Sequence, residues 1–185
     1  GTFRFRHALV RETAYEGLPY SRRTLLHGHV GDVLGEGAGP EADAVLSLHF
    51  LHAQRHADAW RAARRAGDRA RTRNAPAEAA ELYERALHAA RHLDGLDAEM
   101  TDVRELLGDV RYRLADFSGA VAAYRDGRRG AADEDCARLH HKTAVALDRQ
   151  GAFRRALWEL SVAERLAAAA RDTDRLRAQI RTARA

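Results

Sequence analysis

Histidines are the residues of this chain whose spacing could support metal chemistry. His49, His52 and His56 are separated by three and four positions, which would place three imidazoles on one face of a helix. Imidazoles arranged in this way can bind zinc. No cysteine and few carboxylates lie near them, and His49 also falls on an apolar stripe, so we interpret His49 as a packed residue with surface neighbours. The same interpretation applies to the other close histidine pairs, His88/His92 and His140/His141.

The sequence lacks the motifs of phosphate binding and of nucleophilic catalysis. A P-loop needs a lysine after two glycines at fixed spacing, because backbone amides and the lysine hold the phosphates, but the only lysine, Lys142, follows two histidines. The glycine-rich stretch 35–39 follows no predicted strand and indicates a loop between helices. Cys136 lies in the first turn of a predicted helix, where acidic residues 133–135 would oppose formation of a thiolate. We therefore predict no catalytic residue, no bound metal and no cofactor in this chain.

The charge pattern argues against binding to nucleic acid or to a membrane. The formal net charge is +4, but acidic residues are interleaved with basic ones along most of the chain, as on a solvated helical surface. A nucleic-acid site would leave one face nearly free of acids. No apolar run approaches the roughly 20 residues of a membrane-spanning helix, and no signal peptide is recognisable. The single cysteine excludes an intramolecular disulfide and fits a reducing compartment, so we expect a cytoplasmic protein.

The composition predicts an all-α fold. Ala, Leu and Arg dominate and aromatic residues make up only 6% of the chain, a mixture that favours helices over sheets. Residues 2–6 alternate as in a short strand, and helical spacing follows over residues 9–18. Ser21 is the expected N-cap of a second helix, and a third helix is predicted over residues 42–53. The expected apolar face of the second helix is formed by Leu26, Val30, Val33 and Leu34. Because the chain begins at Gly1 and stops within helical spacing, we expect it to be part of a longer protein.

From residue 60 onwards the sequence repeats itself, with steps of 41 and 36 residues. A small residue, an aromatic or leucine four positions later, and a small residue three positions after that recur in three predicted helices: Ala79/Tyr83/Ala86, Ala120/Tyr124/Gly127 and Ala156/Leu160/Ala163. A turn precedes each copy, and upstream of each turn a first helix carries a small residue at the same register: Gly67, Gly108 and Ala144. Small residues let paired helices approach closely, and stacking of such pairs buries the apolar stripe that one pair leaves exposed. Trp60 and Trp158 lie at helical spacing beside small and apolar residues, so we expect both to be packing residues.

This frame resembles the tetratricopeptide repeat (TPR). The residues that carry the resemblance are Gly67, Ala79, Tyr83, Ala86 and Leu87, then Leu107, Gly108, Ala120 and Tyr124, then Gly151, Phe153, Ala156 and Ala163. The tryptophan of the family pattern is replaced by Ala63, Arg104 and His140. The resemblance implies antiparallel helical hairpins stacked as a right-handed superhelix, an α-solenoid. It places three repeats within residues 59–170, at about 60–93, 101–134 and 137–170, and the start of a further, truncated repeat at 171–185.

Residues 3–70 carry a second resemblance, from which we expect residues 1–58 to be a helical junction before the repeats. The strings FRFRHALVRETAYEGLPYSRRTLLHGHVGDVLG and LSLHFLHAQRHADAWRAARRAGDRA are similar to the junction before the repeats in bacterial signal-transduction ATPases of the STAND class, which include transcriptional and cyclase-linked regulators. The resemblance implies an ATPase and winged-helix region before residue 1, an arm that binds a protein or peptide, and no catalysis in this fragment. It leaves oligomerisation of the parent protein open. Two alternatives remain: a TPR scaffold or adaptor of an unrelated complex, and a His-rich metal-binding hydrolase.

The TPR resemblance also implies where a partner would bind. In that family the first helices line a concave groove, and four positions of each repeat point into it. Carried over to this sequence, they are Arg61, Arg64, Asp68 and Arg71, then Asp102, Glu105, Asp109 and Tyr112, then Arg138, His141, Val145 and Asp148. Such a groove would be basic at one end and acidic in the middle, so we expect a partner whose acidic segment lies toward the arginines. The alternative is that these residues are ordinary solvated charges.

Overall fold

The computed structural model describes residues 12, 13 and 15–169, and all regular secondary structure in these residues is helical. The predicted all-α class is therefore confirmed. The strand expected at residues 2–6 and the truncated unit expected at 171–185 lie outside the described residues. The helix expected over residues 9–18 is described in part: residues 12, 13, 15 and 16 are helical, and a turn follows at Gly17.

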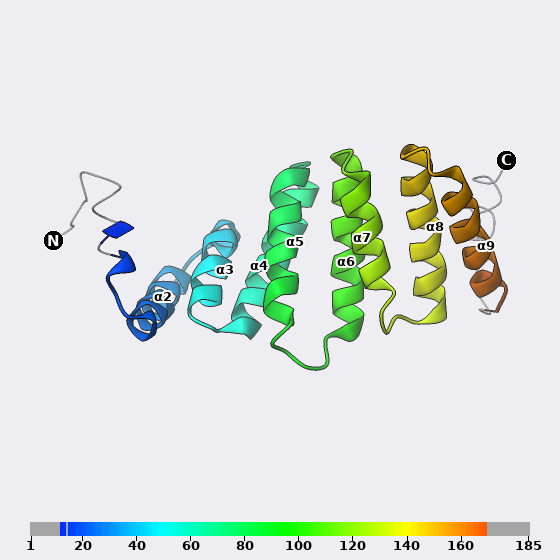
Figure 1. Cartoon of the computed structure of the whole chain (residues 1–185). Helices are drawn as coiled ribbons and strands as arrows, with labels where there is room; N and C mark the ends of the chain where they lie inside the picture. Colours follow the sequence, from blue (N-terminus) through cyan, green and yellow to red (C-terminus); the bar gives the residue numbers. More distant parts are fainter. Residues whose placement is uncertain (1–11, 14, 170–185) are drawn as a thin grey trace.

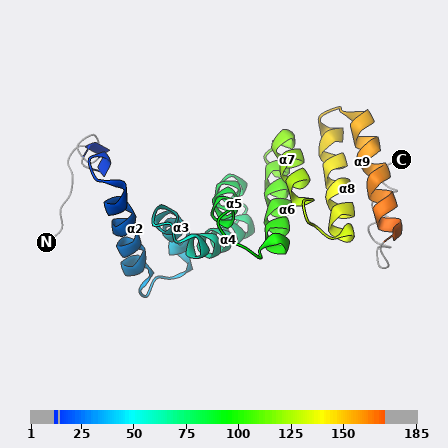
Figure 2. The same cartoon turned by 60° about the horizontal axis from the view of Figure 1, so that its bottom comes forward.

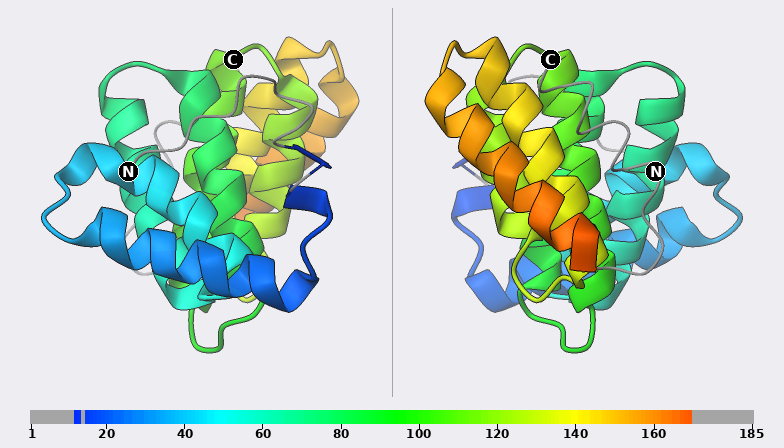
Figure 3. Two further views of the ribbon diagram at one scale, coloured as in Figure 1. Left: turned by 90° about the vertical axis from the view of Figure 1, so that its left-hand side faces the viewer. Right: turned by 90° about the vertical axis from the view of Figure 1, so that its right-hand side faces the viewer.

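The helices follow one another in a row, with α2 at one end and α9 at the other (Figures 1 and 2). Each helix packs mainly against its neighbours in the sequence, and Figure 3 views the row from its two ends. The elements are α2 (Tyr20–Gly35), the 3-10 helix η1 (Pro40–Ala42), α3 (Asp43–His52), α4 (His56–Thr72), α5 (Pro76–Ala90), α6 (Asp97–Arg113), α7 (Phe117–Gly127), α8 (Asp133–Arg149) and α9 (Phe153–Ala169).

Four helices of the row end in the same kind of turn. The second residue after each helix has a positive φ. The amide of the residue that follows it donates a hydrogen bond to the carbonyl five residues earlier, which satisfies a carbonyl that the helix end leaves free. The amide-to-carbonyl pairs are Arg55 to Phe50 (2.9 Å), Ala75 to Ala70 (2.9 Å), Asp116 to Arg111 (3.0 Å) and Ala152 to Leu147 (3.0 Å). The residues with positive φ are Gln54, Asn74, Ala115 and Gly151.

The turn at Gln54 corrects the prediction for the histidine triplet. The expected helix over residues 42–53 ends at His52, and α4 begins at His56. His49 and His52 therefore share a helix while His56 belongs to the next one, so the three imidazoles do not line one helical face. Gln54 reaches a φ of 58° without being glycine or asparagine, which is why the usual sequence signal for a helix end was missing.

Ala115 is the turn residue with the least suitable side chain, and glycine there should stabilise the chain. Ala115 has a φ of 59°, where the Cβ of an L-residue costs about 1–2 kcal/mol. Glycine removes this strain but gives the unfolded chain more freedom, worth about 0.4–1 kcal/mol. We expect Ala115→Gly to raise the free energy of unfolding by about 0.5–1 kcal/mol in urea titrations. As a control, Ala122→Gly on the exposed side of α7 should lower it by about 1 kcal/mol. A loss of stability in both variants would contradict the left-handed turn.

Two helix pairs contain the same core arrangement, 41 residues apart. The ring of Tyr83 in α5 lies against Gly67 in α4, where a Cβ would come within 2.7 Å of the ring, and its hydroxyl donates to Asp68 Oδ1 at 2.8 Å. In α7 and α6 the hydroxyl of Tyr124 donates to Asp109 Oδ1, also at 2.8 Å. Burial, and then the Asp68 carboxylate, raises the pKa of the Tyr83 hydroxyl, so that it remains a donor. The corresponding residues of α8 and α9 are Ala144, Val145 and Leu160.

The structure differs from the prediction at α2. Pro19, not Ser21, stands at the N-cap of this helix. The four apolar residues expected on its buried face are all exposed, and the buried residue is Gly31, whose missing Cβ makes room for the ring of Phe50. Trp60 is buried as predicted, whereas Trp158 is 60% exposed and is not the packing residue that we expected.

Candidate functional site

Charged side chains of α4, α6 and α8 form ion pairs with one another, and we call the surface of these three helices that carries them the charged face. It contains the twelve groove positions implied by the TPR resemblance together with Lys142. Contacts between the three helices connect several of these positions: Arg64 Nη2 lies 3.9 Å from Asp102 Oδ2, and Arg138 Nη2 lies 2.9 Å from Glu105 Oε2. Arg149, which follows the last of these positions on α8, donates from Nε to the Tyr112 hydroxyl at 3.0 Å. The structure therefore brings residues far apart in the sequence onto one surface.

The acids in the middle of the charged face are paired within the chain. Arg138 makes hydrogen bonds of 2.9–3.0 Å to both carboxylate oxygens of Glu105. Lys142 Nζ lies 2.8 Å from Glu105 and 2.7 Å from Asp109. Burial alone would raise the pKa of Glu105, but Arg138 and Lys142 outweigh it and hold this pKa below its ordinary value. This part of the face is thus a neutralised cluster of charges.

Lys142 is the member of this cluster that sequence reasoning missed. A signal for it existed, because Arg138 and Lys142 are four residues apart on α8 and Glu105 and Asp109 are four residues apart on α6. Residues at this spacing share a helix face. Two cations facing two carboxylates at matched spacing would have predicted the pairing once α6 and α8 were taken as neighbours.

The α4 end of the charged face keeps its cations accessible. The side chain of Arg61 is 60% exposed and forms an ion pair along its own helix with Asp58, at 2.6 Å. An exposed pair of this kind contributes little energy and can be exchanged for a partner. Arg64 lies 5.9 Å from the ring centroid of Trp60, and Arg71 is exposed. Asp68 is occupied by the Tyr83 hydroxyl. This end can therefore attract an anionic segment.

His141 contributes no positive charge to the face at neutral pH. Its imidazole is partly buried, and burial, followed by the charge of Lys142, lowers its pKa below the ordinary value. A lowered pKa keeps the ring neutral at pH 7.

A buried ionic cluster lies where α7, α8 and α9 meet. The carboxylate of Glu159 in α9 is 2% exposed and contacts His140 Nδ1 at 2.5 Å and Arg128 Nη1 at 3.0 Å. Arg128 also donates to the Thr143 hydroxyl at 3.3 Å. Sequence reasoning missed Glu159, although it stands where the earlier copies have Ala123 and Leu82, both buried. A carboxylate at a repeat position that is apolar in the two earlier copies was the signal from which its buried role could have been predicted.

Two pairs of histidines stack on each other, one between α2 and α3 and one between α4 and the turn that follows α5. His27 in α2 stacks on His52 with ring centroids 4.6 Å apart, and its Nδ1 lies 2.9 Å from His49 Nδ1. His56 stacks on His92 at 4.0 Å. Burial, and then the neighbouring histidines, lowers the pKa of His27 and of His56, so these rings are neutral at pH 7. Among the described residues, no group of three or more His, Cys, Asp or Glu has a geometry that could hold a metal ion.

Cys136 has the surroundings of a structural thiol. Its Sγ donates to the carbonyls of Arg128 and Ala131 at 3.7 and 3.6 Å. Burial, followed by the charge of Asp133, raises the pKa of the thiol. A raised pKa disfavours the thiolate, which is the nucleophilic form.

Comparison of the sequence with models of known protein families gives no match, and comparison with curated proteins gives none either. Within the described part of the chain, none of the helices combines the length and the apolar character needed to cross a membrane.

Proposed function

We propose that this chain is a TPR-like arm that binds a protein or peptide across the charged face, in a cytoplasmic signalling ATPase of the STAND class. In this proposal α4/α5, α6/α7 and α8/α9 are the three hairpins of a right-handed superhelix. The main support is the matched Gly–Asp–Tyr arrangement, built in two helix pairs from residues 41 positions apart. Helix pairs with a common internal design, each packed on the next, are typical of repeat proteins, whose extended surfaces serve docking.

The distribution of charge gives the proposed partner an orientation. The acids of α6 are neutralised by Arg138 and Lys142, whereas Arg61 and Arg71 at the α4 end are exposed. An acidic segment of the partner would therefore lie over α4. Charge pairing at an exposed rim sets the orientation and the association rate more than the final affinity.

Charge reversal at α4 tests the proposal. We expect Arg61→Glu/Arg64→Glu to weaken binding of a partner captured from lysate, identified by mass spectrometry and then purified, by about tenfold, which is about 1.4 kcal/mol. The variant should also reduce the salt dependence of the association rate. The matched control is Arg22→Glu/Arg91→Glu, an equal change of charge at an exposed position on α2 and at the exposed residue that follows α5. Equal affinity in both variants would remove α4 from the binding surface.

A further inference from the structure

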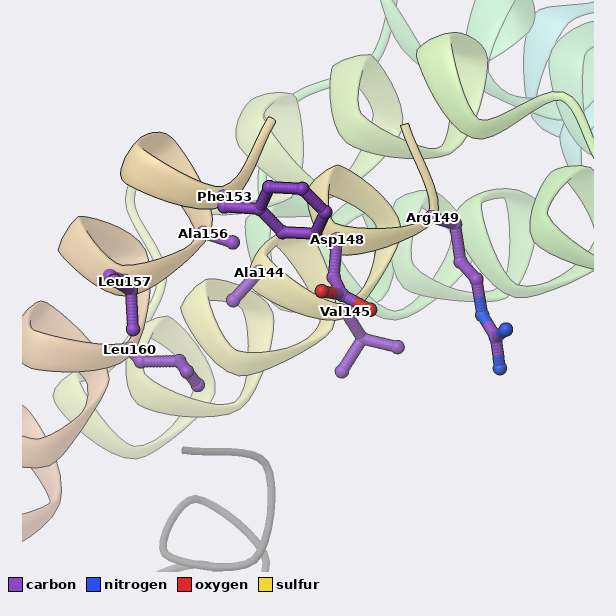
Figure 4. A pocket seen from close by; sticks show the side chains of 8 residues that line it. All are labelled: Ala144, Val145, Asp148, Arg149, Phe153, Ala156, Leu157 and Leu160. Carbon is purple, nitrogen blue, oxygen red and sulfur yellow. The ribbon is translucent and has the colours of Figure 1, made fainter. Parts of the chain in front are cut away.

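The outer end of the row contains an apolar pocket between α8 and α9. Its volume is about 360 Å³, within the range of small-ligand sites. Ala144 and Val145 line it from α8, and Phe153, Leu157 and Leu160 line it from α9 (Figure 4). Phe153 and Leu157 are 62% and 52% exposed, so the rim of the pocket is unusually apolar for an exposed surface.

The pocket lies where the preceding helix pair has two tyrosines. In α6 and α7 the ring of Tyr124 fills the space over Gly108, and the ring of Tyr112 packs edge-on against Phe117 at 5.3 Å between centroids. Thirty-six residues later the corresponding residues are Leu160 and Asp148, while the phenylalanine is kept as Phe153. The pair α8/α9 therefore lacks the two tyrosine rings of α6/α7, but it has Phe153 at the position of Phe117, the residue that Tyr112 contacts.

The charged residues that line the pocket are Asp148 and Arg149, which also interact electrostatically with each other. Figure 4 places the Asp148 carboxylate beside Val145, whereas the Arg149 side chain extends away from the other lining residues. Arg149 is also engaged at Nε by the Tyr112 hydroxyl. If a ligand inserted an aromatic ring into the pocket, a positively charged group next to that ring could form an ion pair with the Asp148 carboxylate.

We propose that the pocket between α8 and α9 binds an aromatic side chain of a protein partner, with an adjacent arginine or lysine on Asp148. The inserted ring would contact Phe153 as Tyr112 contacts Phe117. This inference rests on the proposed function and deepens it, because it adds an aromatic–basic anchor at the α9 end to the acidic segment over α4.

Blocked dipeptide amides test the pocket independently of any partner. We expect N-acetyl-Phe-Arg-amide to shift the amide resonances of residues 144–160 in the full chain, with a dissociation constant of roughly 1–10 mM for so small a ligand. N-acetyl-Phe-Glu-amide and N-acetyl-Ala-Arg-amide should each bind at least about fivefold more weakly. Asp148→Asn should abolish the preference for Phe-Arg over Phe-Glu. Equal binding of the three dipeptides, or an absence of saturable shifts, would overturn the proposal.

A filled variant provides the matched control for folding. Ala144→Gly/Val145→Asp/Leu160→Tyr restores the residues that the two other pairs use, so the variant should fold, and it should lose binding of Phe-Arg. Persistent binding would mean that the dipeptide sits elsewhere. Two further results would also overturn the proposal: binding only after truncation behind Ala169, which would assign the pocket to residues 170–185, or dipeptide shifts that vanish as a dimer forms. If no dipeptide binds but the capture of a partner still depends on Arg61 and Arg64, the pocket inference fails and the proposed function stands.

Discussion

Replacing Glu159 with glutamine should lower the free energy of unfolding by about 3 kcal/mol. The carboxylate is 2% exposed and is bonded to Arg128 and His140, which are themselves largely buried. Glutamine keeps the shape but removes the charge, so the guanidinium of Arg128 is left buried without a counter-ion. Breaking a buried ion pair on one side costs about 3–5 kcal/mol, and the bond from Arg128 to the Thr143 hydroxyl at 3.3 Å offsets little of it.

Urea denaturation at pH 7 measures this loss, and Glu81→Gln is the matched control. Glu81 lies on the exposed side of α5, where the same substitution should change stability by less than about 0.5 kcal/mol. Equal effects of the two substitutions would mean that the cluster at Glu159 does not form.

The same cluster makes a prediction for pH. Burial alone would raise the pKa of Glu159, but the hydrogen bond from His140 and the charge of Arg128 outweigh it and hold the pKa below its ordinary value. Because the pKa of Glu159 is lower in the folded chain than in the unfolded chain, its ionised carboxylate stabilises the fold. This contribution is fully present above the pKa of glutamate in the unfolded chain, which is about 4.3. This stabilisation is lost as the pH falls through the lower, folded pKa. The stability difference between the native chain and Glu159→Gln should therefore shrink below about pH 4.3.

The positions of the helices could be predicted where sequence spacing and turn residues agreed. Helix α8 begins at Asp133, as the run of acids predicts, because carboxylates stabilise the positive end of a helix. Pro76 stands in the first turn of α5, where a proline costs no hydrogen bond, and Gly151 takes the positive φ expected of a helix-ending glycine. These features are local, so each is readable from a few neighbouring residues.

The features that the sequence prediction missed depend on contacts between helices. The break at Gln54 has no glycine or proline to mark it, and it separates two helices, α3 and α4, that pack on each other. The buried role of Glu159 requires Arg128, which follows the last residue of α7, and His140 from α8. In the third copy Val145 and Leu160 replace the aspartate–tyrosine pair of the other two copies, and this replacement indicated the pocket. It could be interpreted only after the tyrosine–aspartate contacts in the other two copies were known.

Gly108→Ala should destabilise the chain by about 1–2 kcal/mol, although alanine is the better helix former. At an open helical site this substitution gains about 1 kcal/mol. At Gly108 the new Cβ would lie 2.2 Å from one ring carbon of Tyr124 and 2.5 Å from another. The ring cannot move aside, because it is 3% exposed and its hydroxyl is held by Asp109 at 2.8 Å. Overpacking of this kind costs about 1–3 kcal/mol and occasionally more, which exceeds the gain in helix propensity.

The third helix pair supplies the compensating change, since it carries Ala144 opposite Leu160. Gly108→Ala/Tyr124→Leu copies that combination, and in urea titrations it should cost at least about 1 kcal/mol less than the sum of the two single substitutions. Gly28→Ala in α2 is the control, because its Cβ would meet only the Cβ of Ala53, at 3.8 Å, and it should leave stability unchanged or raise it by up to about 1 kcal/mol. Strict additivity in the double variant would mean that the missing Cβ of Gly108 does not make room for the ring. The correspondence between the helix pairs, which is the main support for the proposed repeat architecture, would then be lost.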